Sequence, residues 1–325
     1  MTLRIGILGA SRIAESAIVG PAAELGHRLV AVAARDPQRA AAFADKYGVE
    51  RVLNTYAEVI EDPEVDAIYN PLANALHAPW NLAAIAAGKP VLTEKPSANN
   101  REQAAEVAAA ADAAGVTVLE GFHYLFHPVT RRALELAGDG TLGELHRIEV
   151  LMTMPEPPDT DPRWSLDLAG GALMDLGCYG LHLMRTFGAV AGGAPQVTAA
   201  TAVQRNPGVD ASCDVELLFP GGATGTSRHT MASDAYRFTV QVFGSLGDVL
   251  VHNFVQPSED DRVTVTTAAG THVERLGKRA SYTYQLEAFA THLADGSPLP
   301  IGTADAVANM ALIDDAYRAA GLQPR

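Results

Sequence analysis

Lys95 is a candidate catalytic residue because of where its ammonium group is expected to lie. It follows the apolar run Pro90-Val91-Leu92-Thr93 within Glu94-Lys95-Pro96, at the carboxyl end of an expected buried strand. Ligands bind at that edge of an open α/β sheet. Because an uncompensated buried ammonium is costly, this lysine either serves a ligand or points to solvent, and the tripeptide alone leaves both roles open.

Asp175 and Tyr179 form a second candidate group, in the segment Gly170 to Gly180. On an α-helix their spacing places them on one face. A carboxylate and a phenol on an otherwise apolar face can act as an acid/base pair. The alternative is structural: Asp175 caps or pairs within its domain, and Tyr179 packs with a satisfied hydroxyl. Taken by themselves, these two residues favour the structural role.

A loop of the dinucleotide-binding type follows the first expected strand. Its sequence, Gly9-Ala10-Ser11-Arg12-Ile13-Ala14, is a variant of G-x-G-x-x-G/A with serine in the second glycine place. Gly9 permits the tight turn, Ala14 lets the next helix pack on the strand, and the helix amino terminus faces a pyrophosphate. Ser11 adds a hydroxyl for that anion but limits how closely the backbone approaches it. We expect Gly9 to Ile13 to contact a dinucleotide.

The end of the second expected strand indicates which dinucleotide binds. A carboxylate there takes the ribose 2′-hydroxyl of NAD, whereas Arg35 suits the 2′-phosphate of NADP. NADP is therefore favoured, and Asp36, one residue further on, keeps NAD open. Arg39, on the next helical turn, is either a second phosphate contact or a solvated charge.

Strand and helix patterns position these residues in two domains. Up to about residue 120, short apolar strands alternate with alanine-rich helices, which predicts a doubly wound parallel sheet. Beyond about residue 141, longer strands with few helices predict a largely antiparallel sheet. The expected strands are residues 3–9, 28–34, 65–69, 90–93, 116–119, 145–154, 196–204, 213–219, 223–231, 237–243 and 262–267. The expected helices are residues 37–47, 75–87, 100–114, 170–187, 282–293 and 303–320. We therefore expect an α/β protein with a Rossmann domain at 1–121 and an α+β domain with a large open sheet at 122–325.

Composition limits the classes of partner. The 325 residues are 48% hydrophobic and 19% charged, as in a globular protein of two domains. A net charge of −14 opposes binding to nucleic acid or to an anionic membrane. No apolar run reaches the roughly 20 residues that span a bilayer, and the first strand leaves no room for a signal peptide, so we expect a cytoplasmic protein. Cys178 and Cys213 are too few for a disulfide scaffold and are expected to be reduced.

Four motifs, in this order, resemble those of the Gfo/Idh/MocA oxidoreductases. They are Gly9 to Ala14, Asn74-Ala75-Leu76-His77, Glu94-Lys95-Pro96, and Gly170-Gly171 through Asp175 and Tyr179. The resemblance implies that cofactor lies on the Rossmann sheet and that substrate lies between the nicotinamide and the open sheet of the second domain, which also forms the oligomer. A tyrosine four residues after Asp175, where many members have histidine, resembles the branch of glucose-fructose oxidoreductase, dimeric dihydrodiol dehydrogenase and sugar ketoreductases.

The resemblance also assigns roles to individual residues. It implies that Lys95 is the catalytic lysine and that the Lys95-Pro96 bond is cis. The residues that it implies contact the cofactor are Asn74, His77, Glu94, Arg163 and Trp164. For His77 a purely structural role, bonding the backbone at a helix start, stays open.

The implied reaction is reversible hydride transfer between a nicotinamide and a secondary alcohol or ketone of a sugar or cyclic polyol. A tyrosine with an ordinary pKa of about 10 is a poor base at neutral pH. A nearby Lys95 would favour the tyrosinate and stabilise a developing alkoxide. We therefore interpret Tyr179 as the general acid/base, Lys95 as its electrostatic partner, and Asp175 as the group that orients lysine or substrate.

Further residues are expected to line the substrate pocket: His123, Tyr124, His127 and His182. His123 and His127 have the spacing of metal ligands, but no acidic residue of the HExxH kind accompanies them and the family reaction needs no metal, so we expect none. Two other functions remain open: an NAD-dependent glycoside hydrolase of the same fold, and a dinucleotide-sensing regulatory protein without catalysis. We expect a small sugar or polyol as substrate and a homodimer or homotetramer.

Overall fold

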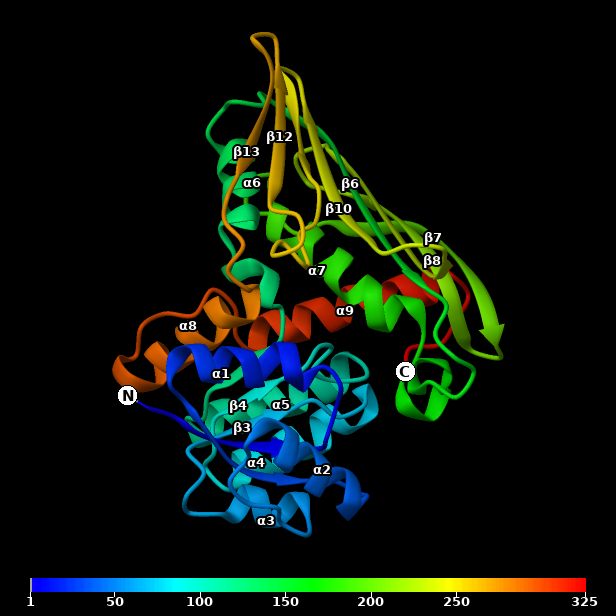
Figure 1. The fold of residues 1–325 in the computed structure, drawn as a ribbon. Coiled ribbons are helices and arrows are strands. Elements are labelled where there is room, and N and C mark those ends of the chain that lie inside the picture. Colours follow the sequence, from blue (N-terminus) through cyan, green and yellow to red (C-terminus); the bar gives the residue numbers. More distant parts are fainter. Residues whose placement is uncertain (1) are drawn as a thin grey trace. The chain divides into compact units, whose positions relative to one another are not determined.

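The structure, a computed structural model, describes residues 2–325. The chain forms two compact units (Figure 1). The first contains the chain up to His123 together with Tyr282–Ala308, and the second contains Tyr124–Ser281 together with Asn309–Arg325. Residues 282–308, which the sequence analysis assigns to the second domain, thus belong to the first unit. Helical periodicity does not indicate on which sheet a helix packs.

Within residues 2–325, the first unit is built on a five-stranded parallel sheet with the order β2-β1-β3-β4-β5. Its strands are β1 (Arg4–Leu8), β2 (Arg28–Ala33), β3 (Ala67–Asn70), β4 (Val91–Thr93) and β5 (Val118–Glu120). The order reverses between β1 and β3, and ligands of such sheets bind outside the carboxyl ends of the strands at this point. The loops that follow β1 and β3 carry Gly9 and Asn74, so both predicted cofactor motifs flank the reversal.

Three helices of the first unit agree with the expected ranges to within two residues: α2 (Pro37–Tyr47), α4 (His77–Ala86) and α5 (Arg101–Ala114). The sequence analysis gave no range for the two short helices α1 (Gly20–Leu25) and α3 (Tyr56–Glu61). A π-helical turn, η1 (Glu15–Val19), precedes α1, and a 3-10 turn, η2 (Asn74–Leu76), precedes α4. Figure 1 shows α1 on one side of the parallel sheet and α3 on the other. In α5, Asn100 accepts a hydrogen bond from Gln103 N at 2.9 Å and Gly115 ends the helix with φ +63°.

The second unit contains, within the described residues, an eight-stranded sheet with the order β13-β12-β11-β10-β6-β9-β8-β7. The strands are β6 (Leu145–Pro155), β7 (Gln196–Asn206), β8 (Val209–Leu218), β9 (Thr224–Ser233), β10 (Arg237–Gly244), β11 (Gly247–Val251), β12 (Arg262–Thr267) and β13 (Gly270–Arg275). The β6–β9 pair is parallel and the other pairs are antiparallel. The predicted fold class is therefore confirmed. The sequence analysis missed β11, which is short, and β13, whose side chains are mostly exposed.

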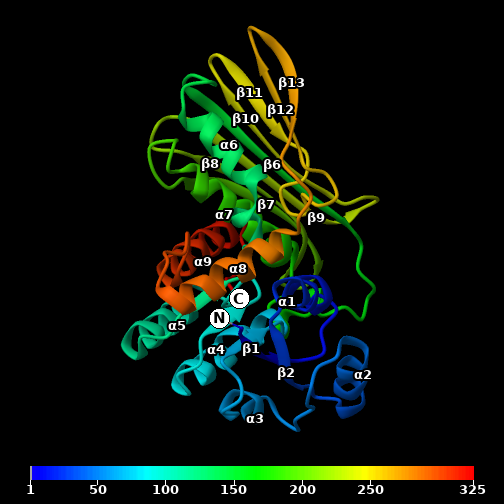
Figure 2. The ribbon, with the colours of Figure 1, turned by 60° about the vertical axis from the view of Figure 1, so that its left-hand side comes forward.

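Helices cover part of this sheet. They are α6 (Pro128–Gly138) and α7 (Cys178–Phe187), with a π-helical turn, η6 (Leu173–Gly177), directly before α7, and the 3-10 turns η3 (His123–Phe126), η4 (Pro162–Trp164) and η5 (Leu166–Leu168). Figure 2 shows α6 beside β11 and β12, while α7 packs on β6 and β9. The chain closes with α8 (Ser281–Asp295) and α9 (Thr303–Ala319). In the part of the chain that is described, no helix combines the length and apolar character that crossing a membrane would require.

Candidate functional site

The turn after β1 requires glycine at its first position. Gly9 has φ +98°, and its backbone N–H donates to the carbonyl of Ala33 at 2.7 Å. A Cβ added there would lie 2.9 Å from Cδ2 of Leu72, which follows β3. Few side chains adopt this φ, and a Cβ here would require the Leu72 side chain to shift. Gly9 therefore brings the loop after β1 close to the loop after β3.

The loop fits the pyrophosphate of a dinucleotide. Ser11 Oγ is buried and has no hydrogen-bond partner among the described residues. A buried hydroxyl without a partner costs about 1–3 kcal/mol, which an anion oxygen would offset. Ala14 is fully buried at the start of the following helical segment, while Arg12 and Ile13 are exposed and Ala10 is half-buried. Ser11 is thus the residue of the loop whose side chain is best suited to hydrogen-bond a bound pyrophosphate.

The carboxylate and the arginines after β2 have different partners. Asp36 caps α2, because its Oδ1 accepts hydrogen bonds from Gln38 N at 2.9 Å and Arg39 N at 3.4 Å. Arg39 donates from Nη2 to the carbonyl of Ala10 at 3.0 Å, which ties α2 to the loop after β1. Arg35 is exposed. Because the Asp36 carboxylate caps α2 and the Arg35 guanidinium is exposed, the end of β2 suits a ribose 2′-phosphate better than a ribose with a free 2′-hydroxyl.

His77 is held by two backbone carbonyls. Its Nδ1 lies 2.7 Å from the Pro96 carbonyl oxygen, and its Nε2 lies 2.8 Å from the Leu72 carbonyl oxygen. Burial lowers the pKa of His77 to about 4, so the ring is neutral at neutral pH and only one nitrogen donates. These contacts match the backbone-bonding alternative for His77. The predicted contact of His77 and of Asn74, at the start of η2, with a cofactor stays a prediction.

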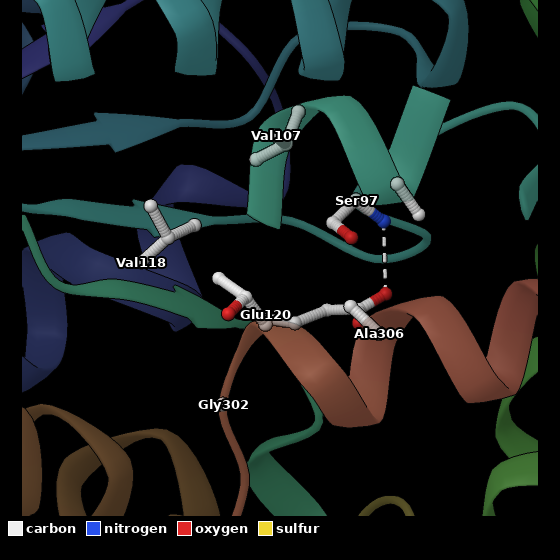
Figure 3. A pocket seen from close by; sticks show the side chains of 8 residues that line it. Ser97, Val107, Val118, Glu120, Gly302 and Ala306 are labelled. Atoms are coloured by element: carbon white, nitrogen blue, oxygen red, sulfur yellow. Dashed lines mark hydrogen bonds between the residues drawn. The ribbon is translucent and has the colours of Figure 1, made fainter. Parts of the chain in front are cut away.

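Three buried side chains hold the segment that contains Lys95. The Tyr69 hydroxyl donates to Glu94 Oε1 at 2.9 Å, and His77 contacts the Pro96 carbonyl. Glu120 Oε1, at the end of β5, accepts from Ser97 N at 2.8 Å. Figure 3 shows Glu120 reaching across to Ser97 at the edge of a small pocket that Ala306 and Gly302 also line. The Lys95-Pro96 bond is cis, as the family resemblance implies.

The second unit pairs Asp175 with Arg163. Arg163 Nε donates to Asp175 Oδ2 at 2.7 Å, and Arg163 Nη1 lies 3.3 Å from Asp161 Oδ1. The negative charge of Asp175 raises the pKa of Arg163 above its already high ordinary value. Trp164, the neighbour of Arg163, is buried and donates from Nε1 to the Pro157 carbonyl at 3.1 Å. Asp175 thus has a cationic partner on the loop after β6.

Tyr179 lies in an aromatic cluster. The Tyr124 hydroxyl and His182 Nδ1 are 2.6 Å apart, and the Tyr124 and Tyr179 ring centroids are 6.0 Å apart. Tyr124 is 0%, His182 1% and Tyr179 5% exposed, so the first two support Tyr179 from within the unit. Asp175 lies in the π-helical turn η6, whereas Tyr179 lies in α7, so the spacing of the two residues is not that of a regular α-helix.

His123 and His127 have separate partners. The His123 ring stacks on Tyr282 with centroids 3.7 Å apart. His127 caps α6, because its Nδ1 accepts from Val129 N at 3.2 Å. Over residues 2–325, no group of three or more His, Cys, Asp and Glu side chains is arranged to hold a metal ion. Their predicted place in a substrate pocket stays a prediction.

Comparison with known proteins identifies the family. Residues 3–122 match the family described as "Oxidoreductase family, NAD-binding Rossmann fold", and residues 130–250 match the "GFO/IDH/MocA C-terminal domain". D-xylose 1-dehydrogenase (NADP(+)) 2 of Haloferax volcanii is 33% identical over 322 residues, which cover 98% of this chain and 97% of that protein.

The chain belongs to the Gfo/Idh/MocA oxidoreductase family. Another member, trans-1,2-dihydrobenzene-1,2-diol dehydrogenase of Mus musculus, is 34% identical over 80% of this chain and 77% of that one. The solved structure of a 3-ketoreductase from Actinomadura kijaniata, in complex with NADP and TDP-benzene, has a TM-score of 0.88 and 28% identity, over 97% of this chain and 96% of that chain. The family that the four motifs predict is confirmed, as is the prediction of a nicotinamide-dependent oxidoreductase.

The supporting residues of this Gfo/Idh/MocA protein were missed by the sequence analysis. Tyr69 and Glu120 support the Lys95 segment, and Asp210 and Arg325 contact the turn before the Tyr179 helix. One signal was available for the first two, because each lies on a short buried strand where a polar side chain is unusual. Asp210 and Arg325 lie far along the chain from the groups that they contact, and no local pattern indicates them.

Proposed function

We propose that this protein transfers hydride between NADP and a secondary alcohol or ketone of a sugar or cyclic polyol. The observation that carries the proposal is the fixed segment around Lys95 at the carboxyl edge of the parallel sheet. Glu94, Pro96 and Ser97 are each hydrogen-bonded to a buried side chain, so the backbone of Lys95 is held at the edge where cofactor binds in this fold. The relatives named above act on sugar or diol substrates, which supports the substrate class.

The preference for NADP rests on the end of β2. Arg35 is exposed there, and Asp36 caps α2 instead of facing a ribose. Ser11 Oγ lies in the loop that would receive the pyrophosphate. Two of the relatives, the xylose dehydrogenase and the 3-ketoreductase, are named with NADP, which agrees with this preference.

In the proposed mechanism, Tyr179 holds and moves the proton of the reacting hydroxyl. Bound NADP supplies the hydride acceptor or donor. The ammonium of Lys95 lowers the energy of the tyrosinate and of the developing alkoxide, so Tyr179 takes a proton from the alcohol in oxidation and returns it to the carbonyl oxygen in reduction. Asp175 pairs with Arg163, and the Tyr124 and His182 pair supports the Tyr179 ring. In this mechanism Asp175 orients groups and does not carry the proton.

Replacing Lys95 by methionine and Tyr179 by phenylalanine tests the proposal. Each change is expected to lower kcat by about 100-fold or more, because general acid–base catalysis contributes about 10²–10⁴-fold. The Kd for NADP should change little. Lys89→Met is the matched control, because Lys89 lies before the amino end of β4, at the opposite end of the strand from Lys95. Its ammonium donates to the carbonyls of Asp62 and Val65 at 3.0 and 2.6 Å. Turnover is followed by nicotinamide absorbance over a panel of aldoses, ketosugars and inositols.

The same assay separates the alternatives. A net change in nicotinamide absorbance during turnover supports the dehydrogenase, whereas glycoside cleavage without a net change would support a hydrolase that uses NAD. Near-normal kcat in both Lys95→Met and Tyr179→Phe would contradict the assigned roles. Absence of turnover with every substrate would favour a regulatory protein.

We also propose a homodimer or homotetramer and a cytoplasmic location. The large open sheet of the second unit supports an oligomer, because the exposed face of such a sheet often pairs with another subunit. The net charge of −14 supports the absence of nucleic-acid and membrane partners. Sedimentation equilibrium of the purified protein decides between monomer, dimer and tetramer.

A further inference from the structure

A buried ion pair in the second unit lies against the start of the helical segment that carries Tyr179. Arg325 Nη2 lies 2.8 Å from Asp210 Oδ1, and the two side chains are 2% and 0% exposed. Removing the two charged groups from water costs several kcal/mol per ion. Their mutual attraction offsets this cost only if further hydrogen bonds satisfy the polar atoms that the ion pair leaves unpaired. A pair buried in this way is therefore weak evidence for a role in stability alone.

The remaining atoms of the pair hold both sides of one turn. Asp210 Oδ2 accepts a hydrogen bond from Leu173 N at 2.6 Å, and Arg325 donates from Nε to the Gly170 carbonyl at 3.0 Å. Tyr317 donates its hydroxyl to Asp210 Oδ1 at 3.1 Å, and the Arg325 guanidinium lies 4.1 Å from the Tyr317 ring centroid. Residues 170 to 173 are thus fixed by one carboxylate and one guanidinium.

The two glycines of the turn make this close approach possible. Gly171 has φ +123°, and a Cβ there would lie 2.2 Å from Asp210 Oδ1 and 2.9 Å from Arg325 Nη2. A Cβ on Gly170 would lie 2.3 Å from the Arg163 carbonyl oxygen. Leu173 then begins η6, which contains Asp175 and leads directly into α7 with Tyr179.

We propose that Asp210 and Arg325 are positioning residues for the reaction: they fix where the Tyr179 helix begins, and so they place the Tyr179 hydroxyl and the Asp175 carboxylate. The inference rests on the proposed catalytic role of Tyr179. A shift of about 1 Å in a reacting group can lower the rate about 100-fold, which is the scale of effect at issue. The cofactor contacts proposed above for the first unit do not involve this pair, and the Arg163 guanidinium, a predicted cofactor contact in the second unit, has separate partners in Asp161 and Asp175.

Arg325→Ala, measured in the full-length enzyme, tests the proposal. We expect kcat to fall about 10- to 100-fold while the KM for NADP stays within about twofold. Guanidinium ion at millimolar, non-denaturing concentration should fill the space left by the side chain and restore part of kcat in a saturable manner. Sodium chloride at equal ionic strength should not. Arg318→Ala is the control, because the Arg318 side chain is 55% exposed on α9, where it pairs with Asp315 at 3.0 Å and lies 3.9 Å from Asp314.

The outcomes separate this inference from the proposed function. If Arg325→Ala has a kcat within about twofold of wild type while Tyr179→Phe is strongly impaired, the positioning role is wrong and the catalytic role of Tyr179 stands. If Tyr179→Phe turns over normally, the proposed function fails. If Arg325→Ala does not fold, Tyr317→Phe decides, since it removes only the hydroxyl that donates to Asp210. A lowered kcat with unchanged KM for NADP then supports the proposal, and an unchanged kcat overturns it.

Discussion

Replacing Gly171 by alanine should destabilise the second unit much more than the same change at Gly270. The two glycines have nearly the same φ, +123° at Gly171 and +124° at Gly270. An alanine Cβ at Gly270 would meet nothing within 4 Å, whereas at Gly171 it would lie 2.2 Å from Asp210 Oδ1. The pair of variants therefore separates backbone strain from steric overlap.

The magnitudes follow from these contacts. Holding alanine in a sparsely populated backbone conformation costs about 1–3 kcal/mol, which both variants share. Overpacking adds about 1–3 kcal/mol at Gly171 alone. Displacing Asp210 from Arg325 would add more, because breaking a buried ion pair costs about 3–5 kcal/mol. We expect the loss for Gly171→Ala to exceed that for Gly270→Ala by at least about 1–3 kcal/mol.

Urea unfolding followed by tryptophan fluorescence measures this difference. The chain has two tryptophans, Trp80 in the first unit and Trp164 in the second. In a Trp80→Phe background, Trp164 alone reports on the second unit, and it is buried at 5% exposure beside the turn. Equal losses of stability in the two variants would refute the claim that the Gly170-Gly171 turn is packed against the Asp210 carboxylate.

Two further predictions concern the first unit. Arg35→Ala should raise the Kd for NADP about 10- to 100-fold and leave the Kd for NAD unchanged, because a hydrogen bond to a charged group contributes about 1.5–3 kcal/mol. The control is Arg28→Ala, because the Arg28 side chain pairs with Glu50 at the other end of β2. Equal effects on the two Kd values would contradict the assignment of Arg35 to the 2′-phosphate. Burial lowers the pKa of His77 in the folded protein from an ordinary 6.5 to about 4. As the pH falls, the unfolded chain therefore binds a proton at this residue before the folded chain does, and the folded state loses stability between about pH 6.5 and pH 4. In thermal melts over this range, His77→Gln should reduce the pH dependence by up to about 1.4 kcal/mol per pH unit, and an unchanged dependence would show that His77 is not buried in its neutral form.

Local sequence signals predicted the parts of the fold that local physics determines. Helix α2 begins at Pro37 after the Asp36 cap and ends before Gly48, and both signals stand in the sequence. The parallel sheet follows from apolar runs separated by helices, and the family resemblance led to the cis bond at Lys95-Pro96. Strand β13 could not be found in this way, because it is an exposed edge strand with polar side chains and no buried face to produce alternation.

The environment of the candidate site depends on contacts that no sequence pattern carries. Arg163 pairs with Asp175 twelve residues away, and Asp210 and Arg325 reach the Gly170-Gly171 turn from β8 and from the end of the sequence. His77 illustrates the limit, because its motif predicts a cofactor contact while the fold surrounds its ring with two carbonyl oxygens. The motifs thus led to the family and its class of reaction, but the partners of each group required the folded chain.

The separation of Lys95 Nζ and Tyr179 Oη, in a crystal structure of the complex with NADP and a turned-over sugar, tests the central claim most directly. The account predicts that the ammonium and the phenol lie within hydrogen-bond reach of each other, directly or through one water molecule, beside the nicotinamide ring. A separation well beyond about 10 Å in that complex would contradict the proposed mechanism, since no proton held on Tyr179 could then be influenced by Lys95 in the way described.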